Sequence, residues 1–393
     1  MNVKSTHHQD SKLLIICLLI SSAIFLNYFF WAINALSFLK YVNFSILIFL
    51  ISYFLVSREF KKYNFIKLFF LSLLILCLGS ALTDWDARSV WLFHAKRIYI
   101  DNDLYGGFDN YMPELMNAYP LIAPSLSATL AKLIGHWNEI FPRAGMTLLF
   151  IPPLIMLKRY FKGNYIYISY SVVLFIVGKQ LFTGELDGLL SLYLFISLMI
   201  ILNVIENKNI NNFELITLFL NSVVLSLLKP EGTMLVFLMN LLVLILIIKK
   251  KCDSNLLLII FLSALPSLCW TFYSYNHLAI YNINDTSYVF SSFYERYDNL
   301  ENLITIFSYF ITNNKFILSL GLILVALLNK KNKEINLYLI FFSLVYLFIL
   351  VILYLSSIYE LEWHLSSSFT RVIKPVTLSF CLFAVYSIKN QNG

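Results

Sequence analysis

Carboxylate and basic side chains gather in one short stretch of this chain. Residues 83 to 118 read TDWDARSVWLFHAKRIYIDNDLYGGFDNYMPELMNA. Only 13% of the whole chain is charged, so charged residues are concentrated in this stretch. A partly desolvated carboxylate at a membrane edge can take a proton from a hydroxyl group and so act as a general base. Asp84 and Asp86 directly follow an apolar run and are the candidates for this role. Each could instead cap the helix expected to begin at Ala87.

Two further polar breaks in apolar sequence carry charges suited to the same chemistry. Asp187 interrupts FTGELDGLLSLYLF, where it is either a helix cap or a site group. Lys229 and Glu231 flank Pro230 in LLKPEGTML, where a basic residue can hold a phosphate group. A plain turn with a local ion pair between Lys229 and Glu231 is the alternative.

Basic residues elsewhere complete the set of candidates for substrate binding. Arg371 and His364 lie in YELEWHLSSSFTRVIKP, and the Arg371 guanidinium could form a fork onto a phosphate. Glu360, Glu362 and His364 could instead hold a divalent ion, so a metal cofactor stays open. Lys96 lies on the helix expected after Asp86, which could equally be an amphipathic helix resting on the membrane surface.

The elements that must position these residues are membrane helices. The 393 residues are 59% hydrophobic and have a mean hydropathy of +0.75, outside the range of soluble globular chains. Unbroken Leu, Ile and Phe runs predict helices of about 20 residues rather than a barrel. We predict an all-α polytopic protein with about 11 to 13 spans and one integral membrane domain over 1–393. Eleven of the helices are expected at 13–33, 41–57, 66–82, 164–182, 188–205, 213–229, 232–249, 255–275, 315–329, 335–355 and 372–388.

Basic clusters at the helix ends predict the orientation of the chain, since positive residues favour the cytoplasmic side. They lie at Lys4/Lys12, Arg58/Lys61/Lys62/Lys67, Lys158/Arg159/Lys162, Lys208, Lys249 to Lys251, Lys330/Lys331/Lys333 and Lys389. This pattern accounts for the net charge of +7 without nucleic-acid binding. The external face should then hold 83–118, the turns at Asp187 and Lys229, a second loop over 276–303, and 356–371.

The region from 119 to 157 conflicts with this orientation if it contains two complete spans. The cluster at Lys158 would then lie on the external side. One net crossing restores agreement, with a partly inserted or juxtamembrane helix that contains Pro120 and Pro124.

Four stretches resemble bacterial GT-C glycosyltransferases that use polyprenyl-phosphate sugars, relatives of the aminoarabinose and protein mannosyltransferases. Their order along the chain strengthens the resemblance. They are WDARSVWLFHAKRIY (85–99), YPLIAPSLSATLAKLIG (119–135), LLKPEGTML (227–235) and EWHLSSSFTRVIKP (362–375).

The resemblance implies a GT-C fold with a juxtamembrane helix in the loop after the third span, and it implies roles for individual residues. Asp86 would take the proton of the acceptor, beside Asp84, and Asp187 would be the second acidic group. Lys229 and Arg371 would meet the lipid phosphate, assisted by Lys96.

The function expected from the resemblance is sugar transfer at the external face of the bacterial inner membrane. The donor would be a polyprenyl-phosphate sugar that arrives through the membrane, and the acceptor an envelope glycan, lipid or polymer. An O-antigen polymerase or ligase is the alternative enzyme. A lipid or solute transporter is less favoured, because the charges lie at helix ends rather than within the spans.

Overall fold

A computed structural model of the chain describes residues 3–80, 84–106, 116–207, 210–277, 286–357 and 359–391. Within these ranges every regular element is a helix, which confirms the predicted all-α class. Thr83 and residues 107–115 of the polar stretch lie outside the described residues, as do Lys208 and 278–285 of the predicted second loop.

The elements follow one another in a single series. They are α1 (Val3–Ala32), α2 (Ser37–Val56), η1 (Arg58–Tyr63), α3 (Asn64–Gly79), η2 (Asp86–Trp91), α4 (Leu92–Asp101), α5 (Ile122–Ile134), α6 (Arg143–Thr147), η5 (Leu148–Phe150), α7 (Ile151–Tyr160), α8 (Tyr165–Ile176), α9 (Gln180–Thr183), α10 (Asp187–Asn207), α11 (Asn212–Leu228), α12 (Pro230–Ile248), α13 (Ser254–His277), α14 (Thr286–Tyr297), α15 (Leu300–Thr312), α16 (Asn314–Ala326), η7 (Lys330–Asn332), α17 (Lys333–Leu355), α18 (Leu361–Val372) and α19 (Lys374–Gln391).

Seven helices in the described part of the chain are long and apolar enough to cross a membrane, which fits a multi-pass membrane protein. They lie in α1, α2, α10, α12, α13, α17 and the joined pair α18–α19. The pair α15–α16, bent by 71°, would make an eighth. Four shorter apolar helices, α3, α5, α8 and α11, accompany them.

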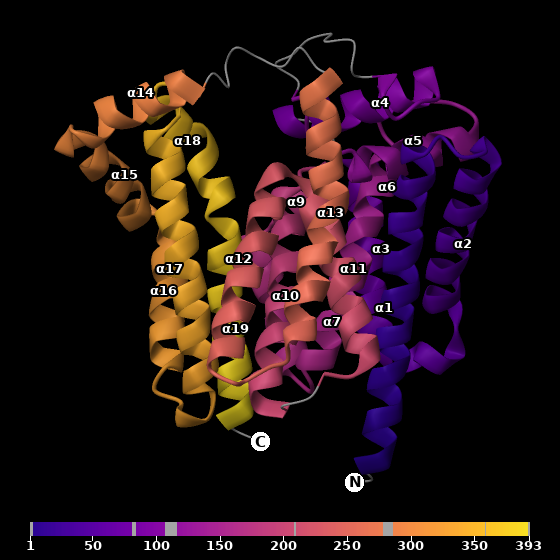
Figure 1. The fold of residues 1–393 in the computed structure, drawn as a ribbon. Coiled ribbons are helices and arrows are strands. Elements are labelled where there is room, and N and C mark those ends of the chain that lie inside the picture. Colours follow the sequence, from indigo (N-terminus) through magenta and orange to yellow (C-terminus); the bar gives the residue numbers. More distant parts are fainter. Residues whose placement is uncertain are drawn as a thin grey trace.

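The long helices stand side by side in one bundle (Figure 1). α10 is the central helix, because 89% of its apolar window is buried, and it packs against α7, α11, α12 and α19. α2 and α13 lie at the periphery, because only a third of the residues in their apolar stretches are buried, as in helices that contact lipid.

Both termini lie at the same end of the bundle, here called the basic end (Figure 1). Lys389 donates to the carbonyl of Tyr160 there, and Lys251 pairs with Glu334. These contacts bring together the ends of α7, α17 and α19 and the turn between α12 and α13. The predicted basic clusters on these elements therefore share one face. Its assignment to the cytoplasm stays a prediction.

The segment between α4 and the end of α5 enters the bundle and returns to the same end of it. α5 has 13 residues, about 20 Å, which is too short for a hydrocarbon core of about 30 Å. Ser125 and Thr129 pair with Asn27 and Trp31 of α1 in the same order along both helices. α5 therefore runs parallel to α1 and ends at the same end of the bundle, opposite the basic end.

The chain then crosses once through α6, η5 and α7, because Pro152 accepts from Cys17 of α1 and Tyr160 lies at the basic end. This geometry agrees with one net crossing between 119 and 157. Pro124 lies in the first turn of α5 and Pro120 just before it, where a missing N–H costs no helical hydrogen bond.

Two segments expected as external loop contain helices. α14 and the start of α15 occupy much of the described part of 276–303, and α18 occupies 361–372. α18 continues into α19 as one apolar span of 30 residues, so the last span begins about one helix earlier than the predicted 372–388. The single turn at Ile373 separates the two helices without ending the apolar face.

α11 and α12 are joined by Lys229 alone, in an extended conformation that reverses the chain. Gly232 lets the two helices approach closely after this turn. A Cβ atom at 232 would lie 1.9 Å from the carbonyl oxygen of Leu225, well inside van der Waals contact. The position of the Lys229 side chain therefore depends on this glycine.

Replacing Gly232 by alanine is expected to destabilise the protein by about 3 kcal/mol or more, because the clash is with backbone that cannot rotate away. Thermal unfolding of the purified protein in detergent measures the change. Gly321→Ala in α16 is the matched control, since nothing lies within 4 Å of its Cβ position. An equal loss in both variants would mean that helix–helix distance at Gly232 is not critical.

Candidate active site

Asp86 and Arg371 form an ion pair although they lie 285 residues apart. Asp86 is the first residue of η2, a π-helix, and Arg371 lies in the last turn of α18. The Arg371 guanidinium donates through Nη1 to Asp86 Oδ2, and both side chains are about a quarter exposed. Arg371 Nε is buried and has no partner among the described residues. π-helical turns are often found at functional sites, since they re-aim a side chain.

A second ion pair joins Asp187 to Lys229, with 2.7 Å between Oδ1 and Nζ. Both side chains are less than 10% exposed, because they lie where α10 begins and where α11 meets α12. Burial alone would lower the pKa of Lys229, but Asp187 and Glu231 outweigh it and raise the pKa above its ordinary value. Lys229 is therefore a permanent buried cation. The predicted local pair between Lys229 and Glu231 is replaced by this longer-range contact.

These two pairs belong to one group of charges. Arg371 interacts electrostatically with Asp187 and Glu185 as well as with Asp86. Lys374, one turn beyond Arg371, interacts with the same two carboxylates and makes no ion pair with a described residue. We call this group the charged cluster. It consists of Asp84, Asp86, Lys179, Glu185, Asp187, Lys229, Glu231, Arg371 and Lys374.

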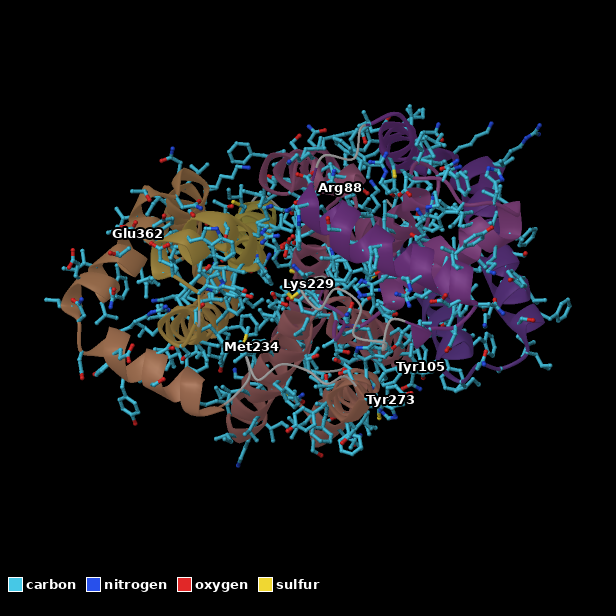
Figure 2. All side chains as sticks on the ribbon, turned by 90° about the horizontal axis from the view of Figure 1, so that it is seen from above. Arg88, Tyr105, Lys229, Met234, Tyr273 and Glu362 are labelled. Atoms are coloured by element: carbon cyan, nitrogen blue, oxygen red, sulfur yellow. The ribbon has the colours of Figure 1, made fainter. Side chains whose placement is uncertain are left out.

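The charged cluster lies at the end of the bundle opposite the basic end. Viewed from there, Lys229 lies near the centre, with Arg88 on η2 to one side and Glu362 on α18 to the other (Figure 2). η2 and α4 lie across this end, in the place predicted for a helix at the membrane surface (Figure 1). A site here is bounded by η2, α10, α12 and α18.

Asp84 belongs to the edge of the charged cluster. It pairs with Lys179, which precedes α9 and is largely exposed. Neither Asp84 nor Asp86 accepts a side-chain hydrogen bond from a backbone N–H of η2 among the described residues, so the alternative of helix capping gains no support. Burial, with Asp84 and Asp187 adding to it, raises the pKa of Glu185, while Gln180 opposes the increase.

Glu231 and His364 border the two ion pairs. Glu231 lies in the first turn of α12, and its buried Oε2 has no partner among the described residues. His364 lies on α18 two turns before Arg371, and its ring packs against Tyr354 with 5.0 Å between centroids. Glu231 interacts electrostatically with Lys229, and His364 with Arg371.

Lys96 is a predicted site residue that the structure does not bring to the charged cluster. Its amine pairs with Glu139 at 3.2 Å, and both side chains are about half exposed. α4 continues away from Asp86, so that Lys96, ten residues on, lies above the turn between α5 and α6. The expected assistance of Lys96 at the phosphate has no geometric support.

Arg143 is a residue that sequence reasoning missed. It is 1% exposed, and its guanidinium donates to the backbone oxygens of Cys77 and Ser80, each at 2.6 Å. A cation at a helix C-terminus satisfies free carbonyls and opposes the helix dipole. Its Cδ also lies 3.8 Å from the Cβ position of Gly184. Arg143 therefore connects the end of α3 to the turn that leads to Asp187. The feature of the sequence that could have identified it is a lone arginine followed by apolar residues.

His94 fixes α4 to the segment before α5. Its ring is 2% exposed, with Nδ1 2.6 Å from the Val90 carbonyl and Nε2 3.1 Å from Asn117 Oδ1. Burial lowers the pKa of His94 below its ordinary value, although both hydrogen bonds oppose the decrease. Through these two contacts His94 holds α4 against the segment before α5.

The free energy of unfolding should fall as the pH is lowered below about 6.5. At such a pH His94 binds a proton in the unfolded chain, whereas burial keeps folded His94 neutral. The folded-state pKa is depressed, so this contribution is present at neutral pH and is lost on acidification. The melting temperature between pH 7.5 and 5 measures it. His94→Gln should reduce the slope, whereas His136→Gln, at an exposed position, should leave it unchanged. Equal slopes in both variants would contradict this account.

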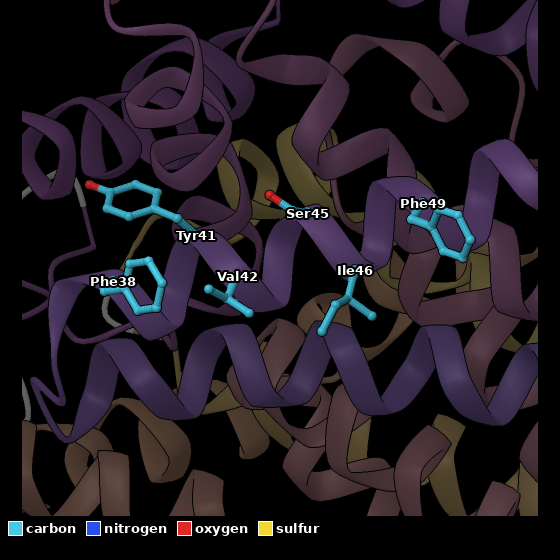
Figure 3. A pocket seen from close by; sticks show the side chains of 6 residues that line it. All are labelled: Phe38, Tyr41, Val42, Ser45, Ile46 and Phe49. Carbon is cyan, nitrogen blue, oxygen red and sulfur yellow. The ribbon is translucent and has the colours of Figure 1, made fainter.

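No three His, Cys, Asp or Glu side chains in the described residues lie so that they could share a metal ion. The predicted alternative of a metal held by Glu360, Glu362 and His364 therefore has no support from their placement. An apolar hollow lies instead along the outer face of α2, and none of its lining residues belongs to the charged cluster (Figure 3). It is lined by Phe38, Tyr41, Val42, Ser45, Ile46 and Phe49.

Comparison with protein-family models, with curated proteins and with solved structures finds no match to this chain. The function has to be argued from the charged cluster itself.

Proposed function

We propose that the chain is a membrane glycosyltransferase of the GT-C type. In this proposal it moves a sugar from a polyprenyl-phosphate donor to an envelope glycan, lipid or polymer at the external face of the bacterial inner membrane. Asp86 is the general base. The end of the bundle that carries the charged cluster is then external and the basic end cytoplasmic.

The observation that carries the proposal is that two ion pairs, Asp86–Arg371 and Asp187–Lys229, interact electrostatically through Arg371 and Asp187. Transfer from a lipid phosphate requires a base near the attacking hydroxyl and cations near the departing phosphate. These two requirements meet in residues from η2, α10, α18 and the α11–α12 turn. The Asp86–Arg371 pair is partly open to solvent, so a substrate can reach it, whereas the Asp187–Lys229 pair is buried beside it.

The reaction balances with these groups. The acceptor hydroxyl loses its proton to Asp86 as its oxygen forms a bond to the anomeric carbon of the donor. The bond between that carbon and the phosphate oxygen breaks, and the phosphate leaves with the electron pair. Arg371, Lys229 and Lys374 stabilise the charge that develops on it.

The pairing of Asp86 with Arg371 gives the donor a role in activating the base. While Arg371 occupies Asp86 Oδ2, that oxygen cannot accept a proton from the acceptor. An anionic phosphate competes for Arg371 and releases the carboxylate.

The proposed architecture needs more spans than the seven or eight long helices. About 11 to 13 spans require α3, α8 and α11 to cross as well, although each has fewer than 18 residues. α11 packs against the long helices α1, α10, α12 and α13, and α8 packs against α19, whereas α3 packs against the shorter helices α6 and α9.

The test is transfer of radiolabelled sugar by the purified protein in proteoliposomes. A panel of polyprenyl-phosphate pentoses and hexoses is offered with an envelope extract as acceptor, and labelled product and released polyprenyl phosphate are measured. Release of both in equal amounts is expected for one donor. Consumption of a lipid-linked oligosaccharide, with every polyprenyl-phosphate sugar left intact, would replace the proposal by a polymerase or ligase.

A further inference from the structure

Trp91 carries a buried indole N–H group that no described residue accepts. Its side chain is 1% exposed and belongs to the last residue of η2. Trp31 is buried to the same extent, and its N–H donates to Thr129 Oγ1 at 2.7 Å. Because buried tryptophan N–H groups usually have a partner, the Trp91 N–H indicates a ligand.

η2 places this N–H close to the proposed base. In a π-helix each backbone N–H bonds to the carbonyl five residues earlier, as that of Leu92 does with Ala87. Asp86 and Trp91 are also five residues apart, so they lie one turn from each other on nearly the same side of η2. Asp86 is partly exposed, so a substrate that meets the base from solvent can also reach the indole.

Lys229 connects Trp91 to two buried carboxylate oxygens. Its Nζ lies 6.0 Å from the centroid of the Trp91 ring and 2.7 Å from Asp187 Oδ1. Asp187 Oδ2 is buried without a partner in the described chain, and so is Oε2 of Glu231, which interacts electrostatically with Lys229. An ammonium group has three N–H bonds, and among the described residues only Asp187 accepts from that of Lys229. Unfilled donors and unfilled acceptors therefore surround one ammonium group.

A hydroxyl group fits this mixture of donors and acceptors. It can accept from the Trp91 N–H and donate to a carboxylate oxygen at the same time. An ionised phosphate only accepts hydrogen bonds, so it would leave Asp187 Oδ2 and Glu231 Oε2 unfilled and place its charge beside theirs. Arg371 Nε is a second buried donor without a described partner, and it offers the phosphate a place away from these oxygens. Lys229 has enough N–H groups to contact both the phosphate and the hydroxyl.

We propose that the Trp91 N–H and Asp187 Oδ2 together bind one hydroxyl group of the donor sugar. The N–H donates to the hydroxyl oxygen, and the hydroxyl donates to Oδ2. The inference rests on the proposed function and adds to it the contacts that select the sugar. A sugar without this hydroxyl leaves two buried polar groups unfilled, which is an effective way for a site to reject an analogue.

Binding of tritiated farnesyl phosphates to the protein in nanodiscs tests the proposal. The probes carry glucose, galactose, mannose or arabinose on the phosphate, and farnesyl phosphate itself is the probe without a sugar. We expect at least one sugar-bearing probe to bind more tightly than farnesyl phosphate. Trp91→Phe should raise its Kd roughly 10-fold, the usual effect of losing a hydrogen bond whose partner stays buried, and should leave the Kd for farnesyl phosphate unchanged.

Two comparisons separate the lost N–H group from a general loss of packing. Trp31→Phe is the matched control, because its N–H bonds within the protein. It should lower the melting temperature and leave every Kd unchanged. Monodeoxy forms of the tightest-binding sugar test the same contact without altering the packing. One of them should bind wild type roughly 10-fold more weakly than its parent, and Trp91→Phe should weaken it no further, because the hydroxyl that meets Trp91 is already missing.

The outcomes separate this inference from the proposed function. Farnesyl phosphate that binds wild type no more tightly than farnesol would overturn both, since no phosphate site would exist. Phosphate-dependent binding to which none of the four sugars adds affinity would overturn the hydroxyl site alone. A Trp91→Phe variant that loses equal affinity for farnesyl phosphate would place Trp91 at the phosphate. Unchanged affinity of Trp91→Phe for every probe would mean that only water fills the N–H, and both of these results contradict the inference.

Discussion

Replacing Asp86 by asparagine is expected to lower the rate of sugar transfer by roughly 10²-fold to 10⁴-fold, the usual contribution of a general base. Asparagine has nearly the same shape but cannot take the acceptor proton. It can still accept a hydrogen bond from Arg371, so the contact between η2 and α18 should survive. The rate of product formation in proteoliposomes at saturating donor measures the effect.

Two control variants make this result specific. Glu139→Gln removes a carboxylate at the same end of the bundle but outside the charged cluster, and should leave the rate unchanged. Within the described residues Glu139 pairs with Lys96 and Trp137 alone. Asp84→Asn breaks the pair with exposed Lys179 and should have a smaller effect than Asp86→Asn. A larger loss in Asp84→Asn would assign the base to Asp84. Full activity in Asp86→Asn would show that Asp86 is not the general base and would contradict the proposed mechanism.

Neutralising either partner of the Asp187–Lys229 pair is expected to cost about 3–5 kcal/mol of stability, because the other charge is left buried without compensation. Asp187→Asn leaves the buried Lys229 amine with the electrostatic influence of Glu231 but without its ion-pair partner. Lys229→Met leaves the Asp187 carboxylate, whose Oδ2 already has no partner in the described chain. Unfolding of the purified protein in detergent measures each loss.

The double variant Asp187→Asn/Lys229→Met should recover most of the stability, since no isolated charge remains. The exposed pair Lys96–Glu139 supplies the matched comparison. Its single replacements should cost about 1 kcal/mol or less and show little coupling, because water screens both groups. Recovered stability without recovered sugar transfer would separate the structural contribution of the buried pair from its part in binding phosphate. Additive losses in the double variant would contradict direct pairing.

Composition and charge pattern were enough to predict the class of the fold and the common face of the basic clusters. Long apolar runs cannot avoid forming helices in a membrane, because every backbone group must find its hydrogen bond within the helix. The single crossing between 119 and 157 also followed from charge, since the Lys158 cluster had to lie with the other basic residues. The boundaries of α18 could not be predicted, because the polar residues of EWHLSSSFTR occupy one face of a helix whose other face is apolar.

The candidate residues Asp84, Asp86, Asp187, Lys229, Glu231, His364 and Arg371 could be chosen from the sequence because charge is scarce in an apolar chain. Their partners could not be chosen. Lys229 pairs with Asp187, 42 residues away, rather than with neighbouring Glu231, and Asp86 pairs with Arg371 across almost the whole chain. Which charges meet depends on which helices adjoin, and this is decided by side-chain packing over the entire bundle.

The same reason explains Lys96 and Arg143. Lys96 carries a charge near Asp86 in sequence, but the direction of α4 takes it to Glu139. Arg143 lies outside any charged motif, and only the approach of α3 and Gly184 places it beside the turn that leads to Asp187. The sequence by itself determined which residues were candidates for the site, because a charged side chain is energetically unfavourable in a membrane unless it has a partner or a function. The tertiary structure alone decided which of them could act together, because distances between helices are not encoded in any local pattern.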